Sequence, residues 1–197
     1  NAPAHWQRLI DKHLAPVRTW CRAFMDDGIL YADTRQELID RFLQVLHICE
    51  TVGFRLKLSK CEFFKQEVKF LGYILSTNGI RTDPDKIKAI EEWPEPLTKT
   101  DIRGFNSLCS FYRNNIKNLS HTLLPLTEAT KNSAPDKYES TPPHLSQALR
   151  QTKNLFKKEV ELAVYDPAKE TLITTDASSE AWGGDISQNG RPLAFIS

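Results

Sequence analysis

Phe24-Met25-Asp26-Asp27-Gly28 is the stretch of sequence that decides the fold expected for this chain. Short apolar runs lie on both sides, and an Asp-Gly step between two such runs is typical of a β-hairpin, so the pattern predicts a hairpin with its turn at Asp27-Gly28. Adjacent carboxylates at a hairpin tip repel each other unless water surrounds them or a divalent cation lies between them. By itself, the Asp-Asp pair therefore fits either a solvated turn or a site for Mg²⁺.

The composition is that of a protein with a buried core and little overall charge. The 197 residues are 40% hydrophobic and 26% charged, and the formal net charge is +1. A near-neutral total excludes a uniformly basic nucleic-acid coat but allows a local basic groove. No apolar run approaches the roughly 18 residues of a membrane-spanning helix, so we expect no membrane partner.

The cysteines and histidines lack the spacing of a metal site. The four cysteines form no CxxC pair, and none of the five histidines has another at the i, i+4 spacing of a helical zinc motif. We therefore expect reduced cysteines and no zinc site.

Helix and turn signals predict the elements of the first 82 residues. Apolar residues at helical spacing predict a helix over Pro3–Leu14, and a capping box that starts at Thr34 predicts a helix that ends at Gly53. A second hairpin is expected from the apolar-rich run Val68–Leu75, with its turn at Asn78-Gly79.

Helices are expected from residue 83 to about residue 159, and strands after it. Asp83, Thr98 and Ser120 are candidate N-caps, and a further helix is expected to start at Thr141-Pro142 after a proline-containing linker. The later β-rich runs are Leu162–Tyr165, Thr171–Thr175 and Leu193–Ile196, with a hairpin turn at Asn189-Gly190.

Several short motifs follow one another along the chain in a specific order. They include Asn1-Ala-Pro-Ala4, Phe24-Met-Asp-Asp27, Phe70-Leu-Gly-Tyr73, Trp93-Pro-Glu-Pro96, Phe111-Tyr-Arg113 and Thr175-Asp-Ala-Ser178. Each motif is weak alone, but the ordered set spans essentially the whole chain. In this order they resemble the reverse transcriptase and ribonuclease H region of gypsy-type LTR retrotransposon Pol polyproteins.

The resemblance implies an α+β fold in three parts. Residues 1–82 correspond to the C-terminal half of a polymerase palm, which is an antiparallel sheet with helices. Residues 83–159 correspond to a helical thumb, and residues 160–197 to the opening strands of a ribonuclease H-like α/β domain. A polymerase palm needs a third aspartate, from a strand that would precede Asn1, so we expect this chain alone not to polymerise DNA.

The resemblance also implies roles for individual residues. Asp26 and Asp27 correspond to the metal-binding catalytic aspartates of the palm, so Mg²⁺ is the expected cofactor and Mn²⁺ the alternative. The nucleotide and template pocket would be formed by Asn1, Pro3, Gln7, Phe24 and Met25, and the primer grip by Leu71, Gly72 and Tyr73.

Two positions beside the aspartates depart from the family. Phe24 stands where the family has tyrosine, so any hydrogen bond of that hydroxyl is lost. Gly28 replaces a β-branched residue or leucine and should loosen the strand behind the turn.

Basic residues with few matching acids predict contact with phosphates. Lys57 and Lys60 lie in a basic stretch, and Arg103, Arg113 and Lys117 lie in residues 102–127, which contain no acid. Such cations give salt-sensitive binding that does not depend on base sequence. An ordinary solvated face is the alternative for these charges, and the aromatic residues among them fit a core stripe at helical spacing.

Asp176 follows a β-rich run, where Thr-Asp-Ala-Ser by itself fits a strand-to-turn cap. The resemblance assigns Asp176 instead to the first metal-binding catalytic carboxylate of a ribonuclease H domain, a fold that holds two metals with several carboxylates. Asp185 stands where the family has an apolar strand residue, which fits either an exposed edge position or a decayed domain.

Two functions of different class follow from these features. The first is RNA-directed DNA polymerase with an attached ribonuclease H, in a longer Pol product. Its partners would be an RNA template, a DNA primer, their RNA–DNA hybrid, deoxynucleoside triphosphates and a second subunit in a homo- or heterodimer. The second is a non-catalytic nucleic-acid-binding or scaffolding protein derived from a retroelement. Either would be intracellular, in a cytoplasmic virus-like particle or the nucleus.

The intact Asp26-Asp27 pair favours the enzyme. The departures at Phe24, Gly28 and Asp185 favour the non-catalytic protein.

Overall fold

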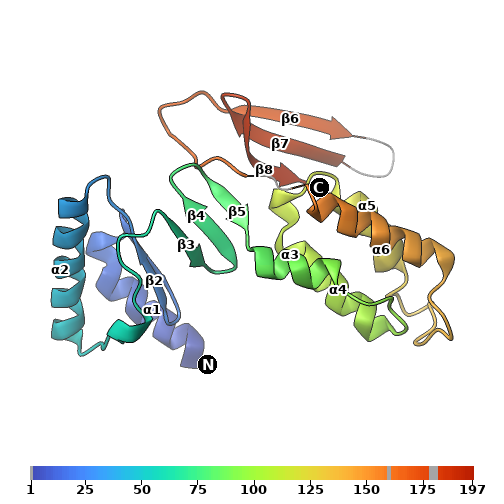
Figure 1. Cartoon of the computed structure of the whole chain (residues 1–197), viewed down its shortest axis with the longest axis horizontal. Helices are drawn as coiled ribbons and strands as arrows, with labels where there is room; N and C mark the ends of the chain where they lie inside the picture. The colour runs from blue at the N-terminus through green and yellow to red at the C-terminus, as the bar shows by residue number, and fades with distance from the viewer. Residues whose placement is uncertain (1, 159–160, 178–181) are drawn as a thin grey trace. The chain divides into compact units, whose positions relative to one another are not determined.

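The computed structural model describes residues 2–158, 161–177 and 182–197 (Figure 1). The chain divides into two compact units, Asn1–Leu71 and Gly72–Ser197. Helices and antiparallel strands occur in both, so the expected α+β class is confirmed. The division at residues 82 and 159 stays a prediction. Asn1 and Ser178, which the sequence places in motifs, lie outside the described residues.

Unit 1 consists of two long helices around a small hairpin. Its elements are α1 (Ala2–Leu14), η1 (Ala15–Val17), β1 (Cys21–Phe24), β2 (Asp27–Leu30), α2 (Arg35–Val52), η2 (Leu58–Lys60) and β3 (Glu67–Phe70). Strands β1 and β2 are antiparallel, and Phe24 lies opposite Asp27. The expected hairpin is confirmed, but its turn is Met25-Asp26, two positions before Asp27-Gly28.

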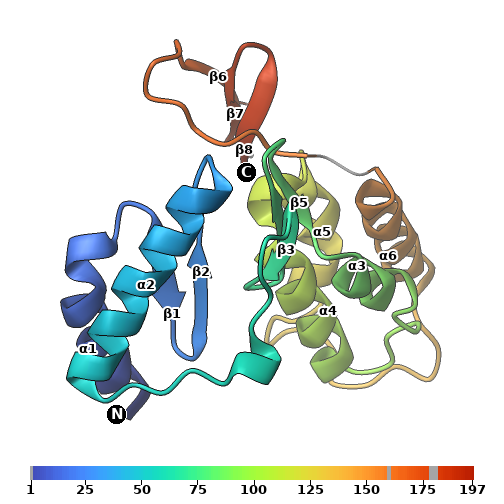
Figure 2. The same ribbon diagram turned by 60° about the vertical axis from the view of Figure 1, so that its left-hand side comes forward.

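A small core joins these elements. Val17, Cys21, Val45 and Cys49 are buried in it, and α1 packs against both α2 and β1 (Figure 2). Helix α2 begins where the sequence predicts, because the Thr34 side chain accepts a hydrogen bond from the backbone N–H of Glu37. It ends at Gly53, whose φ of 82° is the left-handed conformation that glycine adopts without strain.

Unit 2 begins with a hairpin, continues with helices and ends with a sheet. Its elements are β4 (Tyr73–Ser76), β5 (Ile80–Thr82), α3 (Pro84–Glu91), α4 (Lys99–Phe111), η3 (Arg113–Asn115), α5 (Leu119–Glu128), α6 (Pro143–Phe156), β6 (Leu172–Ala177), β7 (Trp182–Gln188) and β8 (Arg191–Ile196). Strands β4 and β5 pair antiparallel, and β7 is the central strand between β6 and β8.

The expected run Val68–Leu75 is not one strand. Leu71 and Gly72 have φ values of 50° and 80°, which turn the chain between β3 and β4. Two successive positive φ values are those of a type I′ turn. Apolar content alone did not reveal this turn, because a leucine occupies its first position.

The helices of unit 2 surround its main core. Tyr112, Phe105, Ile90 and Leu145 are fully buried in it. Helix α4 has the predicted capping box, since the side chains and backbone N–H groups of Thr98 and Asp101 bond reciprocally. Ser120 is not the N-cap of α5, as the sequence suggested. Asn118 occupies that position with a φ of 61°, which asparagine tolerates better than most residues.

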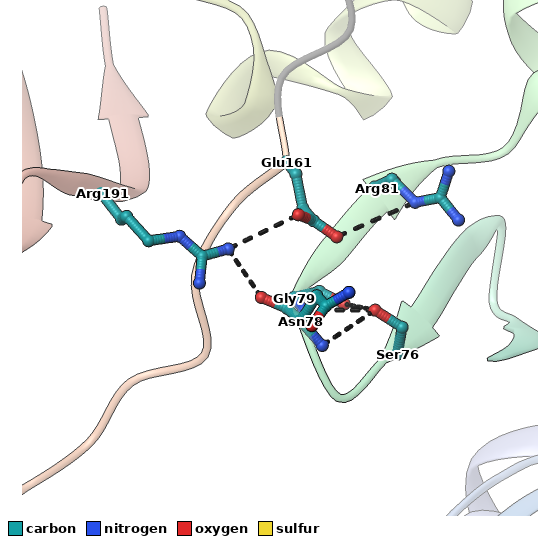
Figure 3. Close-up of polar contacts among 6 residues, drawn as sticks. All are labelled: Ser76, Asn78, Gly79, Arg81, Glu161 and Arg191. Carbon is teal, nitrogen blue, oxygen red and sulfur yellow. Dashed lines mark hydrogen bonds and ion pairs between the residues drawn. The ribbon is translucent and has the colours of Figure 1, made fainter. Parts of the chain in front are cut away.

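The segment that follows α6, from residue 161 onward, pairs with the β4–β5 hairpin (Figure 3). Ile80 and Leu162 exchange two backbone hydrogen bonds, of 2.8 and 2.9 Å between nitrogen and oxygen. This is an isolated bridge, so the strand expected over Leu162–Tyr165 is reduced to one paired residue. Among the described residues, no helix is both long and apolar enough to cross a membrane.

Candidate functional site

The β1–β2 turn presents the Asp26-Asp27 pair at the surface of unit 1. Met25 has a φ of 55° and is the only one of the two turn residues with a positive φ, as in a type II′ turn. Asp26 is the second turn residue and Asp27 the first residue of β2, and both side chains are exposed. The hairpin tip is thus a solvent-accessible double carboxylate.

Helix α1 holds this turn through Gln7. The Gln7 side-chain Nε2 donates to the Ala23 carbonyl at 3.1 Å, and its Oε1 accepts from the Met25 N–H at 2.7 Å. Nε2 also donates to Oδ1 of Asp11 at 2.8 Å, which fixes the orientation of the amide. One side chain therefore satisfies a backbone donor and acceptor on either side of Phe24. These contacts favour a turn at Met25-Asp26 over one at Asp27-Gly28.

Trp6 adds a second contact from the same helix. Its indole Nε1 donates to the Met25 carbonyl at 2.9 Å, while the ring packs against Phe54 with centroids 5.2 Å apart. The sequence indicated Trp6 only as an apolar helix position. An indole is also a hydrogen-bond donor, but its partner depends on the hairpin geometry and could not be read from spacing.

The donor set at the tip suits a hard cation. Neither Asp26 nor Asp27 has an ion-pair partner among the described residues. Carboxylate oxygens are ligands that Mg²⁺ and Mn²⁺ prefer, and Mg²⁺ keeps several waters in its shell. Within the described part of the chain, no cluster of three or more His, Cys, Asp or Glu side chains could hold a metal. The turn therefore offers two ligands of a larger set.

The other residues assigned to the nucleotide pocket differ in their surroundings. Pro3 is exposed in the first turn of α1, and the Phe24 side chain is 49% exposed beside the aspartates. The Gln7 amide is occupied by the hairpin backbone. Gln7 thus supports the turn in this structure, and its contact with a nucleotide stays a prediction.

Gly72 and Tyr73, assigned to the primer grip, lie against the end of α4 within unit 2. The Tyr112 hydroxyl donates to the Gly72 carbonyl at 2.7 Å, and the Tyr73 ring stacks on Phe111 with centroids 5.4 Å apart. The sequence signalled Phe111 and Tyr112 only as helical aromatic residues of the core. Burial raises the pKa of Tyr112 to about 12, so its hydroxyl remains a donor up to a higher pH than that of an exposed tyrosine.

The predicted phosphate-binding cations fall into three settings. Lys57 and Lys60 are exposed around η2 in unit 1, and Arg113 and Lys117 are exposed around η3 in unit 2. Arg103 donates to the backbone carbonyl of Thr130 at 3.1 Å, so part of its guanidinium fixes the end of α5. Arg113 and Lys117 are close in sequence and share one exposed region.

Asp176 lies exposed on β6, opposite Gly183 of β7. Asp185 lies opposite Thr174, and residues two apart on a strand share a face, so the two aspartates are diagonal neighbours on one face of the sheet. Asp185 also pairs with Phe195 on β8 and is half-buried. Of the two alternatives left open for Asp185, an edge position does not fit, because β7 is the central strand of the described sheet.

Gln188 organises the loop that leads into β6. The side chain is 4% exposed, and its Nε2 donates to the Asp166 and Lys169 carbonyls and to the Thr171 hydroxyl at 2.9 to 3.1 Å. Its Oε1 accepts from the Asp166 N–H at 3.0 Å. All its hydrogen-bonding groups are thus used, and no sequence signal indicated this role.

Comparison with known proteins finds similarity to one family. Residues 1–75 match the family model described as reverse transcriptase (RNA-dependent DNA polymerase). The whole chain is 34% identical to the retrovirus-related Pol polyprotein from transposon 297 and 32% identical to that from transposon gypsy, both of Drosophila melanogaster. The chain is therefore similar to the reverse transcriptases of retrotransposon Pol polyproteins. It spans 18% and 20% of the length of those two relatives.

Solved structures of reverse transcriptases share the fold. The foamy viral protease-reverse transcriptase in complex with RNA/DNA hybrid matches all of this chain and 27% of its own, with a TM-score of 0.87 and 20% sequence identity. A second structure of the foamy viral enzyme, dRH in complex with ds DNA, matches with a TM-score of 0.88 over 35% of its chain. At this identity the match establishes the fold of the chain.

Proposed function

We propose that this reverse transcriptase chain is part of an RNA-directed DNA polymerase, which copies an RNA template onto a DNA primer from deoxynucleoside triphosphates. The observation that carries the proposal is the exposed Asp26-Asp27 pair at a turn fixed by Gln7. A catalytic metal site needs ligands held within fractions of an ångström. The two backbone bonds from Gln7 supply that support from a helix rather than from a loop.

In this proposal Asp26 and Asp27 hold Mg²⁺, or Mn²⁺ as the alternative. When bound, two such ions activate a 3′-hydroxyl and stabilise the departing pyrophosphate. The chain's own contribution is to fix the two carboxylates at the tip and to leave them free of competing cations. Phe24 would lie beside the nucleotide as an apolar surface without the hydroxyl of tyrosine.

The remaining residues would bind the nucleic acid. Leu71, Gly72 and Tyr73 would support the primer end, while Lys57, Lys60, Arg113 and Lys117 would contact phosphates. Such contacts are electrostatic, so binding should weaken as salt rises. The similar structures of the foamy viral protease-reverse transcriptase contain RNA/DNA hybrid or dsDNA, which supports the same class of ligand for this chain.

We further propose that Asp176 is a metal ligand of an attached ribonuclease H. It is exposed, and Gly183 opposite it adds no side chain on that face. A homo- or heterodimer, and a site of action in a virus-like particle or the nucleus, stay expectations from the resemblance.

The chain by itself is proposed to bind nucleic acid without polymerising. Only two carboxylates meet at the tip within the described residues. A non-catalytic binding or scaffolding protein is therefore the second candidate, and Gly28 and Asp185 favour it. A primer-extension assay on a homopolymer template separates the two. Sustained Mg²⁺-dependent incorporation that disappears in Asp26→Asn would establish polymerisation by this chain.

Iron-directed cleavage tests the metal site directly. Fe²⁺ replaces Mg²⁺ in such sites, and with ascorbate and peroxide it cleaves the nearby backbone. We expect cleavage near residues 24–28, lost in the Asp26→Asn/Asp27→Asn double variant and kept in the matched control Asp33→Asn/Asp40→Asn. Cleavage elsewhere, or cleavage that persists in the double variant, would remove the basis of the proposal.

A further inference from the structure

The carbonyl of Gly72 is held from the side of the helices. It accepts one hydrogen bond from the Tyr112 hydroxyl at 2.7 Å and one from the Asp83 N–H at 3.3 Å. The first is the shorter, near the ordinary length for a hydroxyl donor, and the second lies beyond the usual range for an amide donor. Tyr112 therefore makes the stronger of the two hydrogen bonds that hold the Gly72 carbonyl.

Tyr112 itself has almost no freedom to move. Its side chain is fully buried at the C-terminal end of α4. Its ring makes edge contacts with Phe111, Tyr73 and Phe156, with centroids 4.8, 5.5 and 6.4 Å apart. A buried ring held on several sides keeps its hydroxyl at one place, and this hydroxyl projects to the Gly72 carbonyl.

The same region leaves little room for a side chain at Gly72. A Cβ there would lie 3.0 and 3.1 Å from two atoms of the Phe111 ring, and the φ of Gly72 is 80°. The residue is thus fixed on one side by a hydrogen bond and on the other by an aromatic ring. A glycine turn needs neither contact for its own geometry, so the hydrogen bond and the ring hold the Gly72 peptide in a defined position.

We propose that Tyr112 is a positioning residue of the primer grip, because its hydroxyl holds the Gly72 peptide in the position from which it would support the primer 3′ end. This inference rests on the proposed function of Leu71, Gly72 and Tyr73. It assigns the end of helix α4 a second task besides core packing. Tyr112 acts through Gly72 and does not itself touch the nucleic acid, since it is fully buried.

The test compares two RNA–DNA hybrids of equal length, one with a recessed DNA 3′ end and one blunt. Affinities are measured by fluorescence anisotropy with the full chain, and we expect the wild-type chain to prefer the recessed end. Tyr112→Phe removes only the hydroxyl. It should weaken binding of the recessed hybrid about tenfold, the equivalent of about 1.4 kcal/mol, and leave blunt-end binding unchanged. Tyr138→Phe is the matched control, because Tyr138 packs on the same core away from the turn.

A second variant guards against simple loss of folding. Gly72→Ala leaves Tyr112 intact but displaces the turn against Phe111, so it should reproduce the selective loss. Equal weakening of both hybrids by Tyr112→Phe, or no change in their ratio, would overturn the inference, as would a wild-type chain that does not distinguish them. A wild-type chain that binds neither hybrid would instead contradict the proposed function itself.

Discussion

The guanidinium of Arg191 donates a hydrogen bond to the backbone carbonyl of Asn78, 113 residues earlier in the chain, at 2.6 Å (Figure 3). Glu161 lies between Arg191 and Arg81, at 3.5 and 3.9 Å. The Ala163 N–H also donates to the Pro192 carbonyl at 2.7 Å. Side-chain and backbone hydrogen bonds therefore join the tip of the β4–β5 hairpin to residues 161–163 and to strand β8.

Gly79→Ala should disrupt the pairing between the hairpin tip and Leu162. A Cβ at Gly79 would lie 2.2 Å from the Leu162 carbonyl oxygen, and backbone cannot give way as a flexible side chain can. We expect a loss of about 1–3 kcal/mol in the unfolding free energy of unit 2, as for other overpacked sites. Denaturant unfolding measures it, and hydrogen exchange should show faster exchange of the Ile80 and Leu162 amides. Gly28→Ala is the control, and an unchanged Gly79→Ala protein would contradict the contact.

Gln7→Ala should release the Met25-Asp26 turn. It removes both bonds to the hairpin backbone, which together contribute about 1–2 kcal/mol for a half-buried amide. We expect lower stability of unit 1 and loss of the iron-directed cleavage near Asp26. Gln36→Ala is a matched control, because Gln36 also bonds an aspartate four residues on, Asp40 at 3.0 Å, but touches no hairpin. Equal effects of the two variants would argue against a specific role for Gln7.

Gly28→Val should stabilise the hairpin. Gly28 lies inside β2 opposite Ala23, and the nearest atom to an added Cβ is the Arg22 carbonyl oxygen at 3.9 Å, an ordinary contact. Replacing a strand glycine by a β-branched residue should gain about 0.5–1 kcal/mol. Thermal unfolding would report a higher melting temperature. A lower one would mean that the glycine serves close approach of another group.

Alkaline pH should destabilise unit 2 through Cys109. Burial raises the pKa of this thiol from 9.0 to about 12. The folded state thus binds the proton more tightly than the unfolded state, so the stability contribution is full below pH 9 and is lost as pH rises toward 12. Cys109→Ala should flatten the fall in melting temperature between pH 8 and pH 10, whereas Cys61→Ala should not. Identical pH profiles for Cys109→Ala and wild type would refute the assignment.

Asp185→Val should stabilise the β6–β8 sheet. Asp185 is half-buried on the central strand, and Asp176 is its diagonal neighbour on the same face. Removing the like charge and adding an apolar cross-strand contact with Phe195 should gain about 0.5–1 kcal/mol. Asp166→Val is unsuitable as a control because Asp166 caps a loop, and Asp136 pairs with the buried Lys99, so exposed Glu170→Val serves instead. A destabilised Asp185→Val protein would show that the carboxylate has a favourable partner.

Local sequence signals were sufficient for most helix boundaries. The Thr34 and Thr98 caps and the Gly53 stop depend on hydrogen bonds within a few residues, so their spacing in the sequence determines them. The Asn189-Gly190 turn is confirmed for the same reason. The ordered motifs also indicated the resemblance to retrotransposon reverse transcriptases.

Errors arose where a distant group competes with a local signal. The Asp27-Gly28 step is a good turn sequence, yet Gln7 bonds the backbone at Ala23 and Met25 and favours the turn two residues earlier. Asn118 rather than Ser120 begins α5, because the chain leaves η3 through a left-handed residue. Neither result follows from propensity, which describes each residue without its tertiary partners.

The sequence by itself determined which residues could do chemistry: the adjacent carboxylates Asp26 and Asp27, the primer-grip candidates around Gly72 and the later Asp176. Periodicity, caps and turn residues act over a few positions, and so they can be read along the chain. Only the tertiary structure decided which distant groups stabilise the local turns, as the Tyr112 hydroxyl bonds the Gly72 carbonyl and the Arg191 guanidinium bonds the Asn78 carbonyl. Such bonds join groups 40 and 113 residues apart, and their geometry exists only once the core has packed.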